Sequence, residues 1–490
     1  MGWLYRFEAK GIQQYVLATE KLREIAGASS LVESLKKDLS DFLLKLGGQQ
    51  KPEVQMNAAG SATIFFHDRE ALDSFQSVWP MFVARTRPGL SIVHGSVEAM
   101  SGQEMAALAD LLRRLDEARN RPTPELPEAG PWMARSGRTG FPAVAVDANG
   151  RRALRDGSVD AMTKAKIIAN VIDGGGATDA LARRVGIPNE CTVPSDINEL
   201  SNGYVAVLHA DGNGIGRYIT EQSTRDPAGW FSRYREFSAA LQRATDKAVQ
   251  GTVATLLERA PSDRRRALPL RPIVLGGDDF TVIVDAQYAV AFAAEFLFRF
   301  EQETRREASS LRPGGFTACA GIAIVKPGFP FHHAYRLSEE LCKASKQGVQ
   351  STGKDQSALA FHRVTTAHLR SWDEIVRCEL TASSGGRMFS GPWSLERIRF
   401  LAGLVRVLQK VPSGSVREWL SLVVENENRA QLHWQRMLEV LDPGVRNELG
   451  PAFDHLGIDE NTGWAANGTP ILDAVGWRAV DSTATLWGAT

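Results

Sequence analysis

Apolar positions in the first part of the chain alternate over short runs and recur at helical spacing between those runs. The alternating runs predict strands, and the runs with helical spacing predict helices. The predicted elements are, in chain order, a strand over Trp3–Phe7, a helix from Gln13 to Ile25, a hairpin of Val54–Met56 with Ala62–Phe66, a helix over about 70–84 and a strand over about 90–97. This is the βαββαβ order of a ferredoxin-like domain.

The same order returns at greater length between about 203 and 365. The predicted elements there are a strand over Tyr204–Leu208, helices between 227 and 258, a hairpin of Pro272–Leu275 with Phe280–Val284, a helix over about 290–306 and a strand over Phe316–Val325. This repeat is the most informative feature of the organisation. It predicts two versions of one palm-like fold in a single chain.

A chain of 490 residues is too long for a single hydrophobic core, so we expect several domains. Many Pro and Gly residues between the two copies predict a connector, and Leu, Val, Ile and Trp at helical spacing after about 370 predict a helical domain. The predicted fold class is α+β. Its segments are a degenerate palm-like domain over 1–118, a connector with short helices over 119–200, a second palm over 201–370 and a C-terminal helical domain over 371–490.

The composition is that of a globular protein, with 43% hydrophobic and 23% charged residues. Lysine plus arginine equal aspartate plus glutamate at 57 each, so net charge gives no argument for a strongly basic nucleic-acid-binding protein. The sequence contains no signal-peptide core and no apolar run of about 18 residues, which predicts a cytoplasmic protein with no membrane partner. The four scattered cysteines form no C-x-x-C pair that would indicate a zinc site.

Candidate chemistry begins at the end of the first strand of the second copy. Asp211 follows the apolar strand, and Gly212, Asn213 and Gly214 come next. The glycines have no side chains that would cover the backbone, so the Asp211 carboxylate and a nearby carbonyl can face a hard divalent cation or a phosphate. Taken alone, the pattern is also typical of an ordinary turn after a strand.

The hairpin of the second copy has Gly276, Gly277, Asp278 and Asp279 at its turn. Adjacent carboxylates repel, and their clustering is costly unless a cation or solvent compensates them. The strand order predicts that Asp278 joins Asp211 to hold one or two magnesium or manganese ions. Such ions bridge triphosphate oxygens and lower the pKa of an attacking 3′-hydroxyl, which is the chemistry of nucleotidyl transfer. An exposed turn without chemistry is the alternative.

Two lysines, Lys343 and Lys346, lie on a helix predicted over Leu337–Gln347. Either could reach a polyphosphate, although a solvated helix face explains a surface lysine equally well. The candidate catalytic residues are therefore Asp211, Asp278 and Asp279. The candidate metal ligands are Asp211, Gly212 and Asp278. The candidate nucleotide-binding residues are Gly212, Asn213, Gly214, Gly276, Gly277, Lys343 and Lys346.

At these residues the chain resembles the large polymerase-like signature subunit of type III CRISPR effector complexes. That family has two palm domains, the second with a Gly-Gly-Asp-Asp hairpin, and a C-terminal helical domain. Ile12–Val16 followed by Lys21–Leu31 resembles the opening helix and Gly/Ser-rich turn of the family, and Ser136–Ala143 resembles its inter-palm connector. The hairpin is the most specific of these matches.

The resemblance implies that Asp211 and Asp278 bind metal, that Asp279 supports them, and that cyclic oligoadenylates are made from ATP as an antiviral defence signal. It also implies partners, namely subunits of a CRISPR RNA–protein complex and target RNA, with a homodimer as the other arrangement. The matching hairpin of the first copy, Asn57–Ser61, has no carboxylate. The first palm is therefore predicted to be catalytically silent and to serve as a wall of the nucleotide site.

Two departures from the family pattern limit what the resemblance implies. The chain begins at the first palm, so neither the N-terminal HD nuclease domain of many relatives nor DNA cleavage is expected. The cysteine cluster that binds zinc between the palms in some relatives is missing. Spacing alone shows neither the base preference nor the ring size of a product.

Two other functions fit parts of the pattern. A diguanylate cyclase is the nearest enzyme alternative, because Gly-Gly-Asp-Asp-Phe is close to the GGDEF signature. No Arg-x-x-Asp inhibitory pattern stands directly before the hairpin, and a second, degenerate palm is not expected in such an enzyme. The alternative from another class is a non-catalytic palm scaffold of an RNA-guided complex, which has no need for clustered carboxylates.

Overall fold

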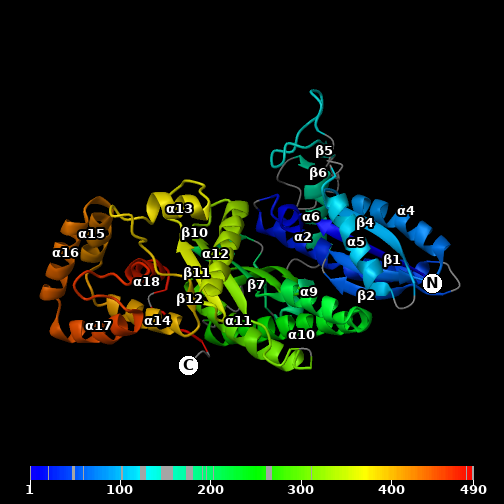
Figure 1. Cartoon of the computed structure of the whole chain (residues 1–490). Helices are drawn as coiled ribbons and strands as arrows, with labels where there is room; N and C mark the ends of the chain where they lie inside the picture. Colours follow the sequence, from blue (N-terminus) through cyan, green and yellow to red (C-terminus); the bar gives the residue numbers. More distant parts are fainter. Residues whose placement is uncertain are drawn as a thin grey trace. The chain divides into compact units, whose positions relative to one another are not determined.

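The structure is a computed structural model of the whole chain (Figure 1). It describes residues 2–19, 21–46, 50–58, 60–100, 103–121, 128–144, 158–172, 180–189, 191–194, 196–201, 203–260, 268–310, 312–481 and 483–487. Ala59, in the predicted turn of the first hairpin, lies outside the described residues, as do 122–127, 145–157 and 173–179 of the predicted connector. None of the described helices is long and apolar enough to cross a membrane.

The chain forms two compact units, each assembled from several stretches of sequence. The first consists of Met1–Asp196, Gly214–Asp246 and Pro272–Asp278, and the second of Ile197–Asn213, Lys247–Arg271 and Asp279–Thr490. The first palm belongs entirely to the first unit. Most of the second palm sheet, and all the C-terminal helices, belong to the second unit. The four-segment division predicted from the sequence stays a proposal for the domain organisation.

The first palm has the predicted ferredoxin-like topology. Its elements are β1 (Gly2–Lys10), α1 (Ile12–Val16), α2 (Leu22–Glu33), α3 (Leu35–Lys45), β2 (Glu53–Ala58), β3 (Ser61–Phe66), α4 (Arg69–Thr86) and β4 (Ser91–Ala99). The antiparallel sheet has the order β2-β3-β1-β4. Its core is aromatic, because Tyr5 meets Phe75 edge-on and Phe75 stacks on Trp79 of α4. The two predicted strands of the hairpin are confirmed.

The single helix predicted from Gln13 to Ile25 is two helices, α1 and α2. α1 ends at Val16, the backbone of Lys21 is extended, and α2 begins at Leu22. Packing against α6 explains why α2 starts as a separate helix. A Cβ at Gly27 of α2 would lie 1.8 Å from the carbonyl oxygen of Lys166 in α6, so the two backbones are in direct contact. Helical spacing along the sequence does not show this reorientation.

Two short strands and four helices of varied length lie in the described residues between the palms. They are α5 (Glu104–Arg119), β5 (Ala143–Val144), β6 (Val159–Asp160), α6 (Ala161–Ile172), α7 (Ala180–Arg184) and α8 (Ile197–Leu200). The long helix α5 packs through Leu111 and Leu115 on Val93 and Val97 of β4. The strands β5 and β6 pair with each other, outside both palm sheets.

The second palm repeats the same topology. Its elements are β7 (Val205–Gly212), α9 (Ile215–Arg225), α10 (Pro227–Arg259), β8 (Leu270–Gly276), β9 (Asp279–Asp285), α11 (Ala286–Glu307) and β10 (Ala318–Val325). The order β10-β7-β9-β8 matches the order of the first sheet. The sequence did not predict that β11 (Ala358–Arg363) and β12 (Trp393–Ser394) extend this sheet to six strands, with β11 parallel to β10. The α+β prediction with two ferredoxin-like palms is confirmed.

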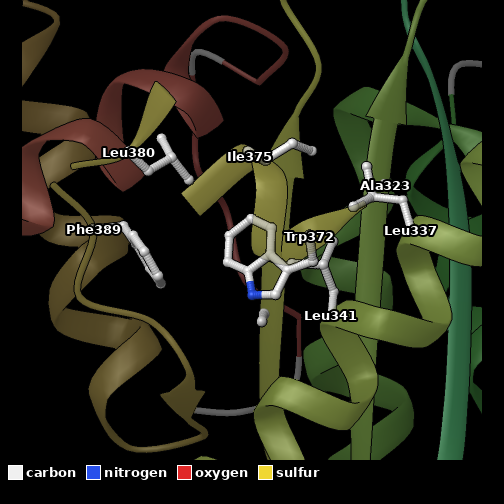
Figure 2. Close-up of a cluster of buried hydrophobic side chains, with 8 residues drawn as sticks. Ala323, Leu337, Leu341, Trp372, Ile375, Leu380 and Phe389 are labelled. Carbon is white, nitrogen blue, oxygen red and sulfur yellow. The ribbon is translucent and has the colours of Figure 1, made fainter. Parts of the chain in front are cut away.

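The C-terminal region is helical, as predicted. Its helices are α13 (Trp372–Glu379), α14 (Arg397–Leu408), α15 (Ser413–Glu425), α16 (Glu427–Val440), α17 (Pro443–Leu456) and α18 (Pro470–Arg478). A cluster of buried side chains joins this region to the palm sheet (Figure 2). Trp372 of α13 lies between Leu341, on the palm helix α12 (Phe331–Thr352), and Phe389, whose ring it meets edge-on. The C-terminal helices therefore support α12 from one side.

Candidate active site

Strand register brings two predicted catalytic carboxylates to one face of the second palm sheet. β7 and β9 run antiparallel, and His209 lies opposite Thr281. Asp211 and Asp279 each lie two residues from this pair toward the same end, and residues two apart on a strand share a face. The side chains of Asp211 and Asp279 are 39% and 28% exposed. They therefore stand at the edge of the core, where solvent and ligands can reach them.

The helix α12 covers this face. It packs on β10, β7 and β11, and Gly321 of β10, opposite His209, makes the close packing on β10 possible. A Cβ at Gly321 would lie 2.0 Å from the carbonyl oxygen of Ser338 in α12, far inside van der Waals contact. Helix α12 is longer than the predicted Leu337–Gln347, because it begins at Phe331 and ends at Thr352.

This packing places Lys346 on the predicted metal ligands. Its Nζ donates to Oδ2 of Asp211 at 2.5 Å and to the carbonyl oxygen of Gly212 at 2.9 Å. The sequence predicted that Lys346 contacts polyphosphate, whereas here the ammonium group binds the carboxylate. Lys343, three residues earlier, has an exposed side chain. The structure thus brings Lys346, but not Lys343, into contact with Asp211.

His209 is a buried member of the site to which the sequence analysis gave no role. Its Nδ1 lies 3.2 Å from Oγ1 of Thr281 and 3.3 Å from Oδ1 of Asp279. Burial lowers the pKa of His209 to about 4, more than the nearby Asp211 carboxylate raises it, so the ring is neutral at pH 7. A signal was present, because His209 lies two residues before Asp211 on one strand and must share its face.

The turn after β7 is held by Asn213. Its Nδ2 donates to Oγ1 of Thr317 at 3.0 Å and to the carbonyl oxygen of Gln356 at 3.4 Å, and its backbone N–H donates to the carbonyl of Thr317 at 2.8 Å. A nucleotide contact through Nδ2 would have to replace those bonds. Gly214 is exposed and has a positive φ of 68°, which starts α9 in a conformation that favours glycine.

The turn between β8 and β9 contains the other predicted residues. Gly277 has a positive φ of 61°, and its backbone N–H donates to Oε1 of Gln242 at 3.2 Å. Gly276 ends β8, Asp278 occupies the turn, and both are half-buried. Asp278 is joined to Asp279 by a peptide bond, so the hairpin has two carboxylates in succession, as the sequence predicted.

The donor atoms at this site suit a hard cation. The ammonium group of Lys346 already shows that Oδ2 of Asp211 and the carbonyl oxygen of Gly212 can share one positive charge. Both are oxygen donors, which magnesium and manganese prefer. Within the described part of the chain, no group of three His, Cys, Asp or Glu side chains is placed to hold a metal. Three cysteines are buried and one is exposed, all as free thiols.

A comparison with known protein families shows which family the second palm resembles. Residues 204–358 match the model of the Cas10/Cmr2 second palm domain. This segment of the chain is therefore similar to the Cas10/Cmr2 second palm domain. The matched segment runs from just before β7 to the start of β11, so it contains Asp211, the hairpin carboxylates and both lysines of α12. The resemblance found in the sequence is therefore confirmed. No curated protein sequence matches the chain significantly.

Solved structures extend the likeness in fold beyond the Cas10/Cmr2 palm. A chain of the Csm1–Csm4 cassette in complex with pppApApA aligns with a TM-score of 0.52 and 14% identity, covering 99% of this chain and 69% of that one. The same cassette in complex with cA4 has a TM-score of 0.48 and 16% identity, with 99% and 70% covered. The complex with one ATP has a TM-score of 0.49 and 14% identity, with the same coverage. At such identities the alignments show fold alone.

Proposed function

We propose that the chain is a metal-dependent nucleotidyltransferase whose catalytic carboxylates are Asp211, Asp278 and Asp279. The observation that carries the proposal is that the candidate catalytic side chains share one face of the second palm sheet. Asp211 and Asp279 lie on it beside the ammonium group of Lys346, inside the segment that matches the Cas10/Cmr2 palm. A hairpin without chemistry would not need this arrangement of two half-buried carboxylates and a lysine.

Each residue has a proposed role. Asp211, the Gly212 carbonyl and Asp278 would hold magnesium or manganese, which supplies charge stabilisation for the triphosphate and a lower pKa for the attacking 3′-hydroxyl. Asp279 supports these ligands. Lys346 can move its ammonium group from Asp211 to a phosphate oxygen, since both are anionic acceptors within the range of one flexible side chain. Gly214, Gly276 and Gly277 leave the backbone without side chains where a nucleotide would approach.

ATP is the proposed substrate, and cyclic oligoadenylates are the proposed products, acting as a defence signal. The fold match to the cassette that binds pppApApA supports this choice, because that ligand is a linear adenylate chain with a 5′-triphosphate. Such a chain is what repeated transfer to a 3′-hydroxyl leaves before cyclisation. We propose that the protein acts within an RNA-guided complex, as a subunit comparable to the matching chain of that cassette.

Incubation of the purified chain with each nucleoside triphosphate and magnesium, followed by mass spectrometry, tests the function directly. We expect adenylate oligomers, including cyclic ones, from ATP. Because activity can depend on an RNA-guided complex, the assay is repeated with the assembled complex and target RNA. Cyclic diguanylate from GTP would favour the diguanylate cyclase alternative. No product under either condition, with the carboxylates intact, would favour a scaffold.

The first palm should matter much less for turnover. Its hairpin pairs Asn57 with Ala62 and has no carboxylate, so replacing Asn57 or Ser61 by Ala should change the rate by less than about threefold. The measurement is product formation from ATP, with thermal unfolding as the check on folding. The comparison is a change in the second hairpin. Equal losses from both hairpins would show that the active copy is assigned wrongly.

A further inference from the structure

We propose that Arg184 and Gln242 are positioning residues that hold the β8 end of the acidic hairpin, and with it Asp278. The inference rests on the proposed function, in which Asp278 binds a metal ion. β8 is the last strand in the order of the six-stranded sheet, and an edge strand presents backbone groups that its own sheet does not bind. Here side chains of the first compact unit bind the backbone on both sides of Gly276.

Arg184, the last residue of α7, binds the strand just before the turn. Its Nη1 donates to the carbonyl oxygen of Leu275 at 2.8 Å. Two carboxylates fix the same guanidinium group. Nε and Nη2 donate to Oδ1 of Asp246 in α10 at 3.1 and 2.9 Å, and Nη1 lies 3.2 Å from both carboxylate oxygens of Glu33 in α2. Because a planar guanidinium group bound on two sides cannot turn away, the Leu275 carbonyl keeps its place beside α2 and α10.

Gln242 of α10 binds the turn itself. Its Oε1 accepts from the backbone N–H of Gly277 at 3.2 Å, and its Nε2 donates to Oδ1 of Asp246 at 2.9 Å. Oδ1 of Asp246 thus accepts from both Gln242 and Arg184. This shared acceptor joins the contact before Gly276 to the contact after it. The two side chains therefore act together on the last backbone groups before the acidic pair.

Ser29 of α2 adds a third contact on the same strand. Its Oγ donates to the carbonyl oxygen of Ile273 at 2.5 Å, and carbonyl groups two residues apart on a strand point to the same edge. Ser29 and Arg184 therefore bind successive outward carbonyls of β8. Both belong to the first compact unit, as does Asp278, whereas Asp279 belongs to the second. The first unit thus positions a proposed metal ligand of the second palm.

Arg184→Met removes the guanidinium group and keeps a long side chain. Misplacement of a catalytic group by about 1 Å can cost on the order of 100-fold, so we expect kcat with ATP to fall about 10- to 100-fold. Arg87→Met is the matched control. Arg87 is also buried, donates to the carbonyl oxygen of Leu31 at 2.7 Å and pairs with Asp38, but these partners lie in α2 and α3. Arg87→Met should lower Tm as well, yet leave kcat per folded protein within about threefold.

Gln242→Leu is a milder change, which keeps the experiment decisive if Arg184→Met does not fold. Gln242 is half-buried, and leucine is also a good helix former. We expect kcat to fall about 10-fold. Gln76→Leu, on α4, is its control, because Gln76 likewise donates to an aspartate of its own helix, Asp73, at 2.8 Å and accepts from Ser96 at 3.2 Å. Parental kcat in a folded Gln242→Leu protein would overturn the proposal.

Hydrogen–deuterium exchange shows directly whether the turn is held. Exchange at the Gly277 amide should be faster in Arg184→Met and Gln242→Leu than in the parent, because the acceptor on Gln242 is lost or no longer fixed. Arg87→Met and Gln76→Leu should leave this exchange at the parental rate. Equal acceleration in the controls would show a general loss of stability and would overturn the proposal.

Manganese binding without nucleotide gives a readout that does not depend on turnover. Titration followed by electron paramagnetic resonance should show about 10-fold weaker affinity in Arg184→Met and Gln242→Leu, and parental affinity in both controls. Unfolded protein reduces the number of sites, but not the affinity of those that remain. If the parent binds manganese and makes no product under any condition, the proposed function fails while this order still tests the two residues. Parental affinity in both Arg184→Met and Gln242→Leu, or no binding by the parent, would overturn the inference.

Discussion

Asp278→Asn should abolish nucleotide turnover and leave the protein folded. If Asp278 holds a metal ion that stabilises the departing pyrophosphate, loss of its charge removes an electrostatic element of the transition state. Losses of this kind typically reach about 100- to 1,000-fold in kcat. The fold should tolerate the change, because the amide has nearly the same shape and one charge fewer stands beside Asp279. Product formation from ATP with magnesium measures the first effect, and thermal unfolding without metal measures the second.

A matched substitution makes the Asp278 result interpretable. Asp116 on α5 is exposed and pairs with Arg119, so Asp116→Asn should keep near-parental turnover. Near-parental turnover by a folded Asp278→Asn protein would reject the metal-ligand role of the hairpin. A protein that unfolds on this substitution would instead show that Asp278 is structural. In that case Asp278→Glu, which keeps the charge, distinguishes the two roles by restoring the fold without restoring the rate.

Removal of divalent cations should have the other large effect. Excess chelator should reduce turnover to background, and magnesium or manganese added beyond the chelator should restore it. The reason is the oxygen-only set of Asp211, Gly212 and Asp278, which suits hard cations. Zinc should not replace them, since no cysteine or histidine is among the proposed ligands. Full activity in chelator, or recovery with zinc alone, would contradict this assignment.

Much of the fold follows from periodicity in the sequence. Both βαββαβ orders could be predicted because each strand is a short apolar run and each hairpin has polar or small residues at its turn. The extension of the second sheet by β11 and β12 could not be predicted from the sequence. β12 is the pair Trp393–Ser394 in a predominantly helical region, and it becomes a strand only because β11 offers an open edge. A strand of two residues is too short to show alternation in the sequence, so only its pairing with β11 determines its conformation.

The candidate site was predicted in part. The motifs pointed to Asp211 and the hairpin carboxylates because adjacent charges are conspicuous in a sequence. The contact between Lys346 and Asp211 spans distant parts of the chain, and it depends on how closely α12 approaches the sheet. His209 was overlooked for a similar reason. Its place beside Asp279 depends on the register between β7 and β9. Alternation in the sequence predicts which residues of one strand share a face, but not which residue of the neighbouring strand lies opposite.

Gly321 contributes no functional group, yet its position is among the least replaceable in the second palm. A single methyl group there would need the space of the Ser338 carbonyl, so the helix would have to lift off the strand. That lift would withdraw Lys346 from Asp211 and Tyr335 from His209 together, because both side chains belong to the same rigid helix. The absence of a side chain at Gly321 therefore sets the distance between α12 and the sheet, and with it the positions of Lys346 and Tyr335. A search for tolerated sequence changes should treat this glycine as strictly as the acidic residues.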